Sequence, residues 1–384
     1  METMQPALKN GRNVWDRVNM PQSEFEGRVE RIRAEMKRGG MDLLLLCGKD
    51  YKEYGDPCYV SNFVTRLPRG ALAVVPLTGP IAVFFEGASR GLPSYLATTW
   101  VRELKAASDV ARECVKYLKE KGLIPCTVGF GRLKEFMPHQ QFQFLEESLT
   151  GCKIVDAARI VSNLRMVKSI KESDQIRRAG RIVKKAFDFI GSARFDGMNE
   201  QLLDAMVRRE ARLEGAGDFR MLVGIKTEKG WSFRPVEGRK IETGVTVTVY
   251  IAVEFERYWA EAARTFVVRE SSLSEMSGDT AAKYAQALAA VRPKKSVSEV
   301  FAEVRNRVQE SGFEFVADYG LGGGIGLSLN ESPVITEKGK EKLKEGMCLA
   351  LRIAAKEPSG RFVMVGNTLI VGKEGAEVVT GKME

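Results

Sequence analysis

Hydrophobic and polar residues alternate along the first part of the chain with periods that change between helix and strand. Apolar residues recur at helical spacing from Phe25 to Met36, and Gly39-Gly40 is typical of a helix end. Ser23 and Glu26 have the spacing of a capping box, which predicts that this helix begins there. Further apolar runs predict strands over Leu43–Cys47, Gly70–Val75, Ile81–Phe85 and Thr127–Phe130, and a helix over Ala107–Lys121.

Strands that alternate with helices indicate an α/β domain, which we assign to residues 1–158. A chain of 384 residues is too long for one ordinary core, so a second domain is predicted over residues 159–384. Its opening segment, Ser162 to Ala179, has the apolar spacing of one long amphipathic helix.

The composition is that of a globular protein, with 44% hydrophobic and 28% charged residues. No apolar run approaches the roughly 18 residues of a membrane span. The N-terminus lacks a basic segment followed by an apolar one, so we expect no secretory signal and a cytoplasmic protein. The net charge of +9 comes from interspersed Lys, Arg and Glu rather than from a basic run. Such mixed charges are typical of a solvated surface and argue against a nucleic-acid partner, although the excess charge favours an anionic substrate.

Cysteine and histidine offer little chemistry. The six cysteines form no C-x-x-C pair, so buried reduced thiols are expected. His139 is the single histidine, and we interpret it as structural. Gly320 to Gly326 lacks the G-x-G-x-x-G spacing and the following Lys of a phosphate-binding loop.

Four segments of the second half, taken in their order along the chain, carry a resemblance to known proteins. They are Tyr250 to Phe266, Tyr319 to Pro333, Gly346 to Arg352, and Val365 to Val371. In this order they resemble the creatinase/aminopeptidase P/prolidase superfamily. Tyr59-Val-Ser61-Asn-Phe63 looks like the strand-end motif of the creatinase N-terminal domain. The resemblance implies an α/β N-terminal creatinase-like domain followed by an α+β domain of the pita-bread fold.

In the metallopeptidases of this superfamily, two Asp, one His and two Glu hold a pair of divalent ions. Matched residue by residue, those positions are Tyr250, Glu261, Gly323, Arg352 and Gly366. A carboxylate remains only at Glu261, and Arg352 puts a permanent cation where a dication should bind. We therefore expect no metal ligands and no cofactor.

Creatinase works on this fold without a metal, and Phe233-Arg-Pro235-Val-Glu-Gly-Arg239-Lys-Ile resembles its His-x-Pro-Val-x-x-Arg-Lys-Leu segment. The leading His is the acid/base of creatinase, and Phe233 takes its place here. The creatinase mechanism therefore does not carry over. Any acid or base in this chain must be a carboxylate, Tyr, Lys or Cys.

The resemblance implies that Tyr250, Glu261 and Arg352 project into one cleft, with Arg264 and Glu331 near its wall. We expect Glu261 to act as a general base or to hold a cationic group, and Tyr250 to act as an acid. Arg352 and Arg264 would clamp an anion. The remaining possibility is that Glu261 and Arg352 form an ion pair that fills the space of the metals.

In creatinase-like dimers the N-terminal domain of one subunit borders the cleft of its partner. Arg66 and Arg69 occupy the corresponding stretch, so they are candidates for substrate contacts in a homodimer, together with Phe233 and Glu331. As single arginines they also fit an ordinary surface.

The first functional hypothesis is a metal-independent, creatinase-like hydrolase or lyase that acts on a small polar, carboxylate-bearing substrate. The alternative is a non-catalytic pseudo-peptidase that acts as a binding or interaction protein. A direct Glu261–Arg352 contact would favour the alternative. A conventional Xaa-Pro metallopeptidase is the least favoured, because residues 156–384 contain no histidine.

Overall fold

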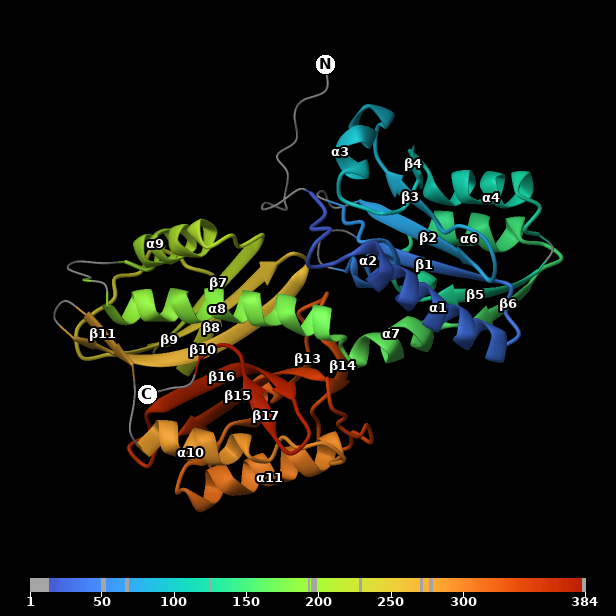
Figure 1. The fold of residues 1–384 in the computed structure, drawn as a ribbon. Coiled ribbons are helices and arrows are strands. Elements are labelled where there is room, and N and C mark those ends of the chain that lie inside the picture. The colour runs from blue at the N-terminus through green and yellow to red at the C-terminus, as the bar shows by residue number, and fades with distance from the viewer. Residues whose placement is uncertain are drawn as a thin grey trace. The chain divides into compact units, whose positions relative to one another are not determined.

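The computed structural model describes residues 14–49, 53–65, 69–124, 126–192, 194, 199–227, 230–269, 272–275 and 279–381, with the backbone alone at 226–227, 230–232 and 279–281. The chain divides into two compact units, Met1–Arg165 and Met166–Glu384. The boundary lies a few residues beyond the predicted one at residue 158. Figure 1 shows the elements of each unit.

The first unit is built on a mixed sheet. Among the described residues, six strands pair in the order β4-β3-β2-β1-β5-β6. The strands are β1 Leu43–Lys49, β2 Gly70–Pro76, β3 Ala82–Glu86, β4 Glu103–Ala107, β5 Thr127–Gly131 and β6 Lys153–Asp156. The helices are α1 Gln22–Arg38, α2 Gly55–Ser61, α3 Leu92–Leu96, α4 Val110–Glu120, α5 Leu133–Phe136, α6 His139–Ser148 and α7 Ala158–Met166, and a 3-10 turn spans Ser89–Gly91. The predicted α/β fold is confirmed.

Three local predictions for this unit are wrong in detail. Helix α1 begins after Pro21, which makes no side-chain cap, so Ser23 lies inside the first turn and cannot cap it. The predicted helix from Ala107 begins at Val110, because Ala107 ends strand β4 and Asp109 caps Ala111 and Arg112. The segment expected to be a strand end, around Ser61, is the last turn of helix α2.

The second unit is built on one strongly curled sheet. Its main strand order is β14-β13-β15-β16-β10-β9-β7-β8, and the short strands β11, β12 and β17 pair with β10, β15 and β16. The strands are β7 Asp218–Thr227, β8 Gly230–Arg234, β9 Thr246–Phe255, β10 Tyr258–Arg269, β11 Ser272–Glu275, β12 Glu314–Phe315, β13 Gly322–Gly324, β14 Glu331–Val334, β15 Cys348–Lys356, β16 Phe362–Val371 and β17 Ala376–Val378. The helices are α8 Ile170–Ser192, α9 Glu200–Leu213, α10 Asp279–Leu288 and α11 Val297–Glu310, and a 3-10 turn spans Ala317–Tyr319.

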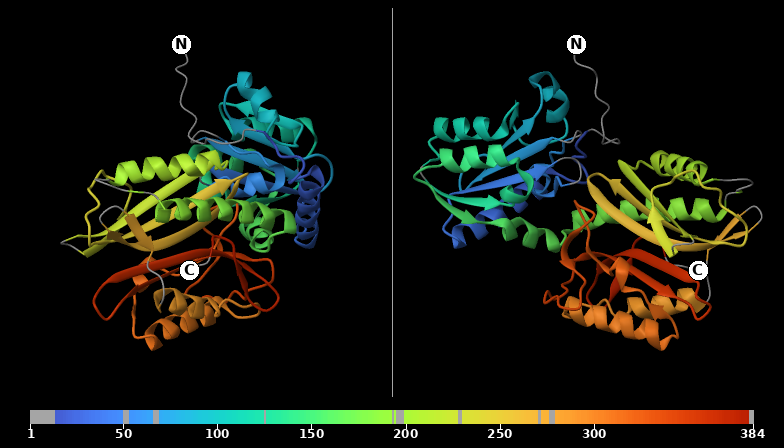
Figure 2. Two further views of the ribbon diagram at one scale, coloured as in Figure 1. Left: turned by 60° about the vertical axis from the view of Figure 1, so that its left-hand side comes forward. Right: turned by 180° about the vertical axis from the view of Figure 1, so that it is seen from behind.

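Among the described residues, helices cover only the outer, convex face of this sheet. Helices α8 and α9 lie over the half formed by β7 to β10, and α10 and α11 lie over the half that contains β15 and β16 (Figures 1 and 2). Alternate residues of each strand fill two cores beneath them, such as Val249 and Ile251 in one core and Leu349 and Leu351 in the other. The remaining alternate residues therefore form the inner, concave face.

The predicted single helix from Ser162 to Ala179 is two helices. Helix α7 ends at Met166 and α8 begins at Ile170. Between them Val167 forms a β-bridge with Met347, and Lys168 donates its backbone N–H to the carbonyl of Gly346 at 2.9 Å. Ser169 and Glu172 then exchange backbone-to-side-chain hydrogen bonds of 3.0 and 3.1 Å. This is the reciprocal pattern of a capping box, so a local signal for the break was present in the sequence.

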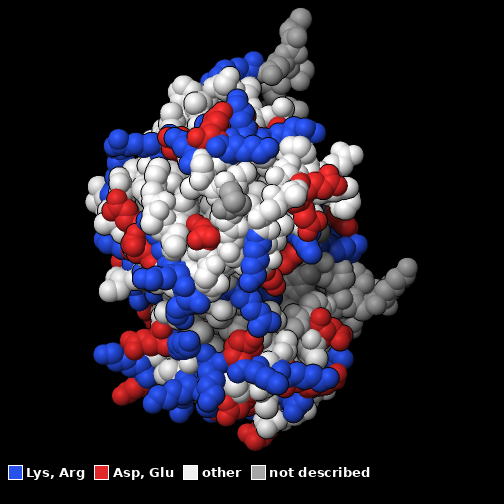
Figure 3. Space-filling view, turned by 90° about the vertical axis from the view of Figure 1, so that its right-hand side faces the viewer, with Lys and Arg blue, Asp and Glu red and all other residues white. Residues whose placement is uncertain are grey.

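Charged side chains are mixed on the surface. Across the face seen in Figure 3, Lys and Arg alternate with Asp and Glu. No helix among the described residues has the length and apolar character needed to cross a bilayer.

Candidate functional site

The candidate site lies on the concave face of the second unit. Tyr250 of β9 is in register with Ala263 of β10, Ala263 with Gly366 of β16, and Gly366 with Arg352 of β15. Residues directly opposite each other in a sheet share a face. One row of positions across four strands therefore holds Tyr250, Ala263, Gly366 and Arg352. Glu261 lies on the same face as this row because it stands two residues before Ala263 in β10.

The three predicted central residues are in direct contact. The Tyr250 hydroxyl donates to Oε2 of Glu261 at 2.6 Å, and Nη1 of Arg352 donates to Oε1 at 2.7 Å. The Glu261 side chain is 2% exposed, whereas that of Arg352 is 24% exposed. Glu261 is thus held from both sides, and the partly exposed members of the triad are Tyr250 and Arg352. We call these three residues the Glu261 triad.

Burial and charge shape the acid–base properties of this triad. The pKa of the Tyr250 phenol is raised well above 10, first by burial and then by the negative charge and hydrogen bond of Glu261. The pKa of Arg352 is also raised, chiefly by the charge of Glu261. Tyr250 is therefore held as the neutral phenol and Arg352 as the cation across the physiological range.

At two of the predicted site positions, Gly323 and Gly366, a side chain would clash with its neighbours. A Cβ at Gly366 would lie 2.9 Å from Cγ of Arg352, so the glycine makes room for the arginine. A Cβ at Gly323 of β13 would lie 2.5 Å from the carbonyl oxygen of Pro333. Backbone contacts this short exclude any side chain at position 323 in the present backbone arrangement.

Arg264 was expected at the wall of the cleft, and the structure contradicts this. Its side chain lies on the convex face, because residues three apart in a strand point to opposite sides of the sheet. The guanidinium donates to the carbonyl oxygens of Ala263, Gly366 and Gly381 and to Oδ1 of Asn367, at 2.6 to 3.0 Å. Nε of Arg264 lies 3.1 Å from Glu275. Burial lowers the pKa of this arginine.

The other predicted contact residues are spread over the two units. Phe233 of β8 lies on the concave face, in an aromatic cluster with Tyr319 and Phe362. Glu331 begins strand β14, where it accepts a hydrogen bond from Nζ of Lys168 at 3.0 Å and one from the backbone of Ser328. Arg69 precedes strand β2 in the first unit. Arg66 lies outside the described residues.

Arg220, Lys168 and the aromatic cluster were not predicted from the sequence. Arg220 of β7 is in register with Ala252 of β9, which pairs in turn with Glu261. The guanidinium of Arg220 lies 4.6 Å from the centre of the Trp259 ring and acts to lower the pKa of Tyr250. Alternation along β7 would have placed Arg220 on the concave face, but only the strand pairing brings it near Glu261.

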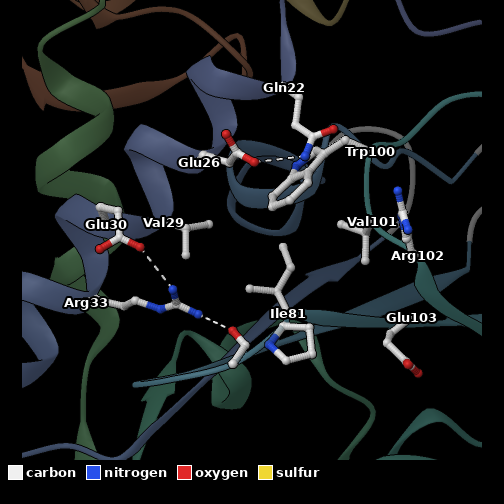
Figure 4. Close-up of a pocket in the computed structure, with 12 residues that line it drawn as sticks. Gln22, Glu26, Val29, Glu30, Arg33, Ile81, Trp100, Val101, Arg102 and Glu103 are labelled. Carbon is white, nitrogen blue, oxygen red and sulfur yellow. Dashed lines mark hydrogen bonds and ion pairs between the residues drawn. The ribbon is translucent and has the colours of Figure 1, made fainter.

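The first unit contains a separate hollow of about 420 Å³ between α1 and the ends of β3 and β4. In Figure 4 the side chains of Val29, Ile81 and Trp100 form its apolar wall. Four of its polar side chains form two pairs: Arg33 contacts Glu30 at 3.0 Å, and Gln22 donates to Glu26 at 2.8 Å. The residues that line this hollow include none of the predicted site residues.

Comparison with known proteins follows the division into two units. Residues 174–373 match the model of metallopeptidase family M24, and residues 28–167 match that of the creatinase/prolidase N-terminal domain. The chain belongs to metallopeptidase family M24.

Its relatives in family M24 include peptidases. An Xaa-Pro dipeptidase of Pyrococcus horikoshii is 22% identical over 336 residues, which are 80% of this chain and 92% of that protein. An uncharacterized peptidase of Bacillus subtilis, YqhT, is 22% identical over 60% of this chain and 67% of its own length.

Solved structures of the family share the fold. The prolidase from Pyrococcus horikoshii superimposes with a TM-score of 0.76 at 18% identity, over 93% of this chain and 99% of that one. An Xaa-Pro dipeptidase from Bacillus anthracis superimposes with a TM-score of 0.75 at 20% identity, over 94% and 99% of the two chains. The predicted pita-bread domain is thus confirmed.

The name of family M24 raises the question of metal binding. The sequence resemblance predicts that Tyr250, Glu261, Gly323, Arg352 and Gly366 stand at the positions of the metal ligands in its peptidases. Within the part of the chain that the structure describes, no group of three or more His, Cys, Asp or Glu side chains is arranged to hold a metal ion.

Proposed function

We propose that this M24 protein binds a small carboxylate-bearing molecule at Arg352, in a site that works without a dinuclear metal centre. The observation that supports it is the geometry of Glu261. Each of its carboxylate oxygens accepts a hydrogen bond, one from Tyr250 at 2.6 Å and one from Arg352 at 2.7 Å. In this proposal the Glu261–Arg352 ion pair occupies the place of the two metal ions, and Arg352 binds the carboxylate of the ligand.

The residues present do not fit two divalent cations. A metal at Glu261 would have to displace a guanidinium that is charged at every physiological pH. Two close cations also need several carboxylates to offset their repulsion, and Glu261 is the one carboxylate among the five matched positions. The backbone around Gly323 leaves no room for an imidazole there. The proposal therefore includes no step through a metal.

Arg352 has the properties of a carboxylate receptor. A guanidinium carries five N–H donors in a planar fork, and the hydrogen bond to Glu261 uses Nη1. Its side chain is partly exposed, so a ligand can approach it from the concave face. Glu261 and Tyr250 fix the orientation of the fork before the ligand arrives, which reduces the entropy lost on binding.

The same geometry favours binding over catalysis. A general acid works best when its pKa lies near the working pH, and the pKa of Tyr250 is well above 10. Each carboxylate oxygen of Glu261 already accepts one hydrogen bond, which leaves fewer lone pairs for a substrate proton. The metal-independent hydrolase or lyase stays a prediction.

A second candidate function is hydrolysis of Xaa-Pro dipeptides. It is favoured by the similarity to an Xaa-Pro dipeptidase over 80% of this chain. It requires metal ligands other than the five matched residues. The two candidates differ in metal content, and this difference makes them separable.

The test combines elemental analysis with calorimetry on the full chain. Protein purified without chelators is analysed for bound metal and then titrated with acetate, N-acetylglycine, glycyl-proline and the neutral amides of the first two. We expect substoichiometric metal, millimolar or tighter binding of the carboxylates, and about tenfold weaker binding of the amides.

The matched variants are Arg352→Gln and Arg361→Gln. Arg361 is an exposed arginine that also pairs with a glutamate, Glu357. Only Arg352→Gln should weaken carboxylate binding, by about tenfold or more. Equal loss in both variants, or no carboxylate binding at all, overturns the proposal. Two metal equivalents together with release of proline from glycyl-proline would establish the second candidate instead.

A further inference from the structure

We infer that the ligand bound at Arg352 carries a second carboxylate, and that Arg220 binds it. This inference deepens the proposed function and rests on it, because it names dicarboxylates as the class of ligand. The observation that supports it is that the side chains of these two arginines reach neighbouring positions of strand β10 from opposite sides.

Arg220 lies on the concave face of the sheet. The residues before and after it in β7, Phe219 and Met221, are buried in the core beneath the helices. Because successive side chains of a strand point to opposite faces, Arg220 points away from that core. Its side chain is 32% exposed, compared with 24% for Arg352. A ligand can therefore reach both guanidinium groups from the same side of the sheet.

The two arginines end close to each other on strand β10. Arg352 donates to Glu261 at 2.7 Å, and the guanidinium of Arg220 lies 4.6 Å from the centre of the Trp259 ring. Trp259 and Glu261 are two residues apart in β10, so they share a face and lie about 7 Å apart along the strand. Arg352 comes from β15 and Arg220 from β7, which lie on opposite sides of β10 in the strand order. One short ligand can therefore span the two cations.

The guanidinium of Arg220 makes no hydrogen bond within the described part of the chain. Its ion pair with Asp218 is 3.9 Å long, which exceeds hydrogen-bond distance. The contact with the Trp259 ring holds the guanidinium by its charge and supplies no oxygen acceptor to its N–H groups. A carboxylate has two oxygens that match the fork of a guanidinium, so it can supply these acceptors.

The two cations act on the same part of the concave face. Burial raises the pKa of Tyr250, and the positive charges of Arg352 and Arg220 both oppose that rise. Both arginines thus lie within electrostatic reach of the phenol that Glu261 holds. A ligand with two carboxylates can pair with both arginines, whereas a monocarboxylate can pair fully with only one of them.

The experiment compares dicarboxylates with ligands that lack one charge. The full chain is titrated in a calorimeter with succinate, glutarate and adipate, and with the monoamide of each. We expect at least one dicarboxylate to bind about tenfold more tightly than its monoamide, because the monoamide loses a charge-assisted pair with Arg220. Glycyl-glutamate and glycyl-glutamine give the same comparison for the end of a peptide. A preference for the second charge among the peptides alone supports the inference and assigns the two carboxylates to a peptide.

A variant tests whether Arg220 binds the second carboxylate. Arg220→Gln should weaken binding of the preferred dicarboxylate to the level of its monoamide, and it should change the affinity for the monoamide by less than about twofold. The control is Arg208→Gln, which removes the same charge. Arg208 of α9 also lies over an aromatic ring, that of Phe219 at 4.8 Å, and pairs with Asp204, but it lies on the convex side. This control should leave both affinities unchanged, and circular dichroism verifies that each variant is folded.

The outcomes separate this inference from the proposed function. Equal affinities for every dicarboxylate and its monoamide, all lost in Arg352→Gln, overturn the inference and leave the proposed function in place. A preference for the second charge that persists in Arg220→Gln places its partner elsewhere, and one that is lost equally in Arg208→Gln reflects overall charge. Either result also overturns the inference. Absence of binding for all the carboxylates overturns the proposed function itself.

Discussion

The convex and concave faces of the curled sheet each place one arginine against Gly366, and the two arginines differ in burial and in partners. On the convex face Arg264 donates to the Gly366 carbonyl oxygen at 2.6 Å and is surrounded by further acceptors. On the concave face the stem of Arg352 packs against the Cα of Gly366, and its head pairs with Glu261. Arg264 ties the end of the chain to the sheet. Arg352 keeps part of its guanidinium at the surface.

The difference in burial and partners between Arg264 and Arg352 separates an arginine that stabilises the fold from one that can bind a ligand. Burial lowers the pKa of Arg264, and its hydrogen bonds to main-chain oxygens compensate for lost hydration. The charge of Glu261 raises the pKa of Arg352, which remains 24% exposed. The donors of Arg264 are shared among main-chain oxygens, Asn367 and Glu275 in a buried place, whereas Arg352 pairs with Glu261 and stays partly exposed.

The largest effect on stability is expected when Arg264, the arginine of the convex face, is replaced. Arg264→Met leaves Gly366, Gly381 and Asn367 without a shared donor in a buried place, so we expect a loss of about 3–5 kcal/mol in the free energy of unfolding. Urea denaturation measures it. Arg269→Gln, an exposed change on the same strand, should cost less than about 0.5 kcal/mol. A small effect at Arg264 would mean that the convex network is dispensable.

The second effect concerns the ion pair of the concave face. Arg352→Met leaves Glu261 nearly buried beside Tyr250 without its cation, and we expect a loss of about 2–4 kcal/mol. The double change Glu261→Met with Arg352→Met should recover at least about 1 kcal/mol relative to the sum of the single changes. A double-mutant cycle in urea measures the coupling. Additive losses would contradict the pairing.

The raised pKa of Tyr250 predicts that the protein loses stability at alkaline pH. Its pKa is raised in the folded state above its usual 10, so between these two values the folded protein keeps a proton that the unfolded chain has lost. Stability is therefore retained below pH 10 and falls as the pH rises above it, by up to about 1.4 kcal/mol per pH unit from this group. Tyr250→Phe should remove that part of the slope in urea unfolding between pH 10 and 11. Between pH 8 and 9 the two proteins should differ by a constant amount, and an identical slope above pH 10 would refute the assignment.

The smallest effect tests the space around Gly366. Gly366→Ala puts a Cβ within 2.9 Å of Cγ of Arg352, and we expect a cost of about 1 kcal/mol. In an Arg352→Ala background the cost should fall below about 0.5 kcal/mol, because the crowded atom is gone. Gly375→Ala, where a Cβ meets nothing within 4 Å, is the neutral control. An undiminished cost in the double variant would place the crowding at Leu351 or Ala263.

Local patterns predicted most elements well and their boundaries less well. The apolar runs located β1, β2, β3 and β5, and Gly40, with a φ of 64°, ends the first helix region as expected. The break between α7 and α8 was missed because amphipathic spacing continues through it. A β-bridge from Val167 to the distant Met347 interrupts the helix there, and that contact cannot be read from the spacing.

The candidate site was predicted in part. Tyr250, Glu261 and Arg352 were expected together because the order of family motifs implies that these positions converge, and the structure brings them into contact. Arg264 was misplaced, although its spacing from Glu261 already indicates the opposite face of a strand. Arg220 and the aromatic cluster needed the strand order, because their residues come from separate parts of the chain.

The sequence by itself determined the family framework and the alternation of buried and exposed positions. It also predicts that Tyr, Gly and Arg stand where the family's metallopeptidases have metal ligands. Only the tertiary structure decided which of the polar residues meet. Glu261 and Arg352 are separated by 91 positions in the chain. They come into contact because only strand β16 lies between β10 and β15, and because Gly366 of β16 has no side chain to block the Arg352 side chain. Hydrophobic periodicity is a local property of the chain, whereas an ion pair across three strands depends on register and on the volume of the residue between them.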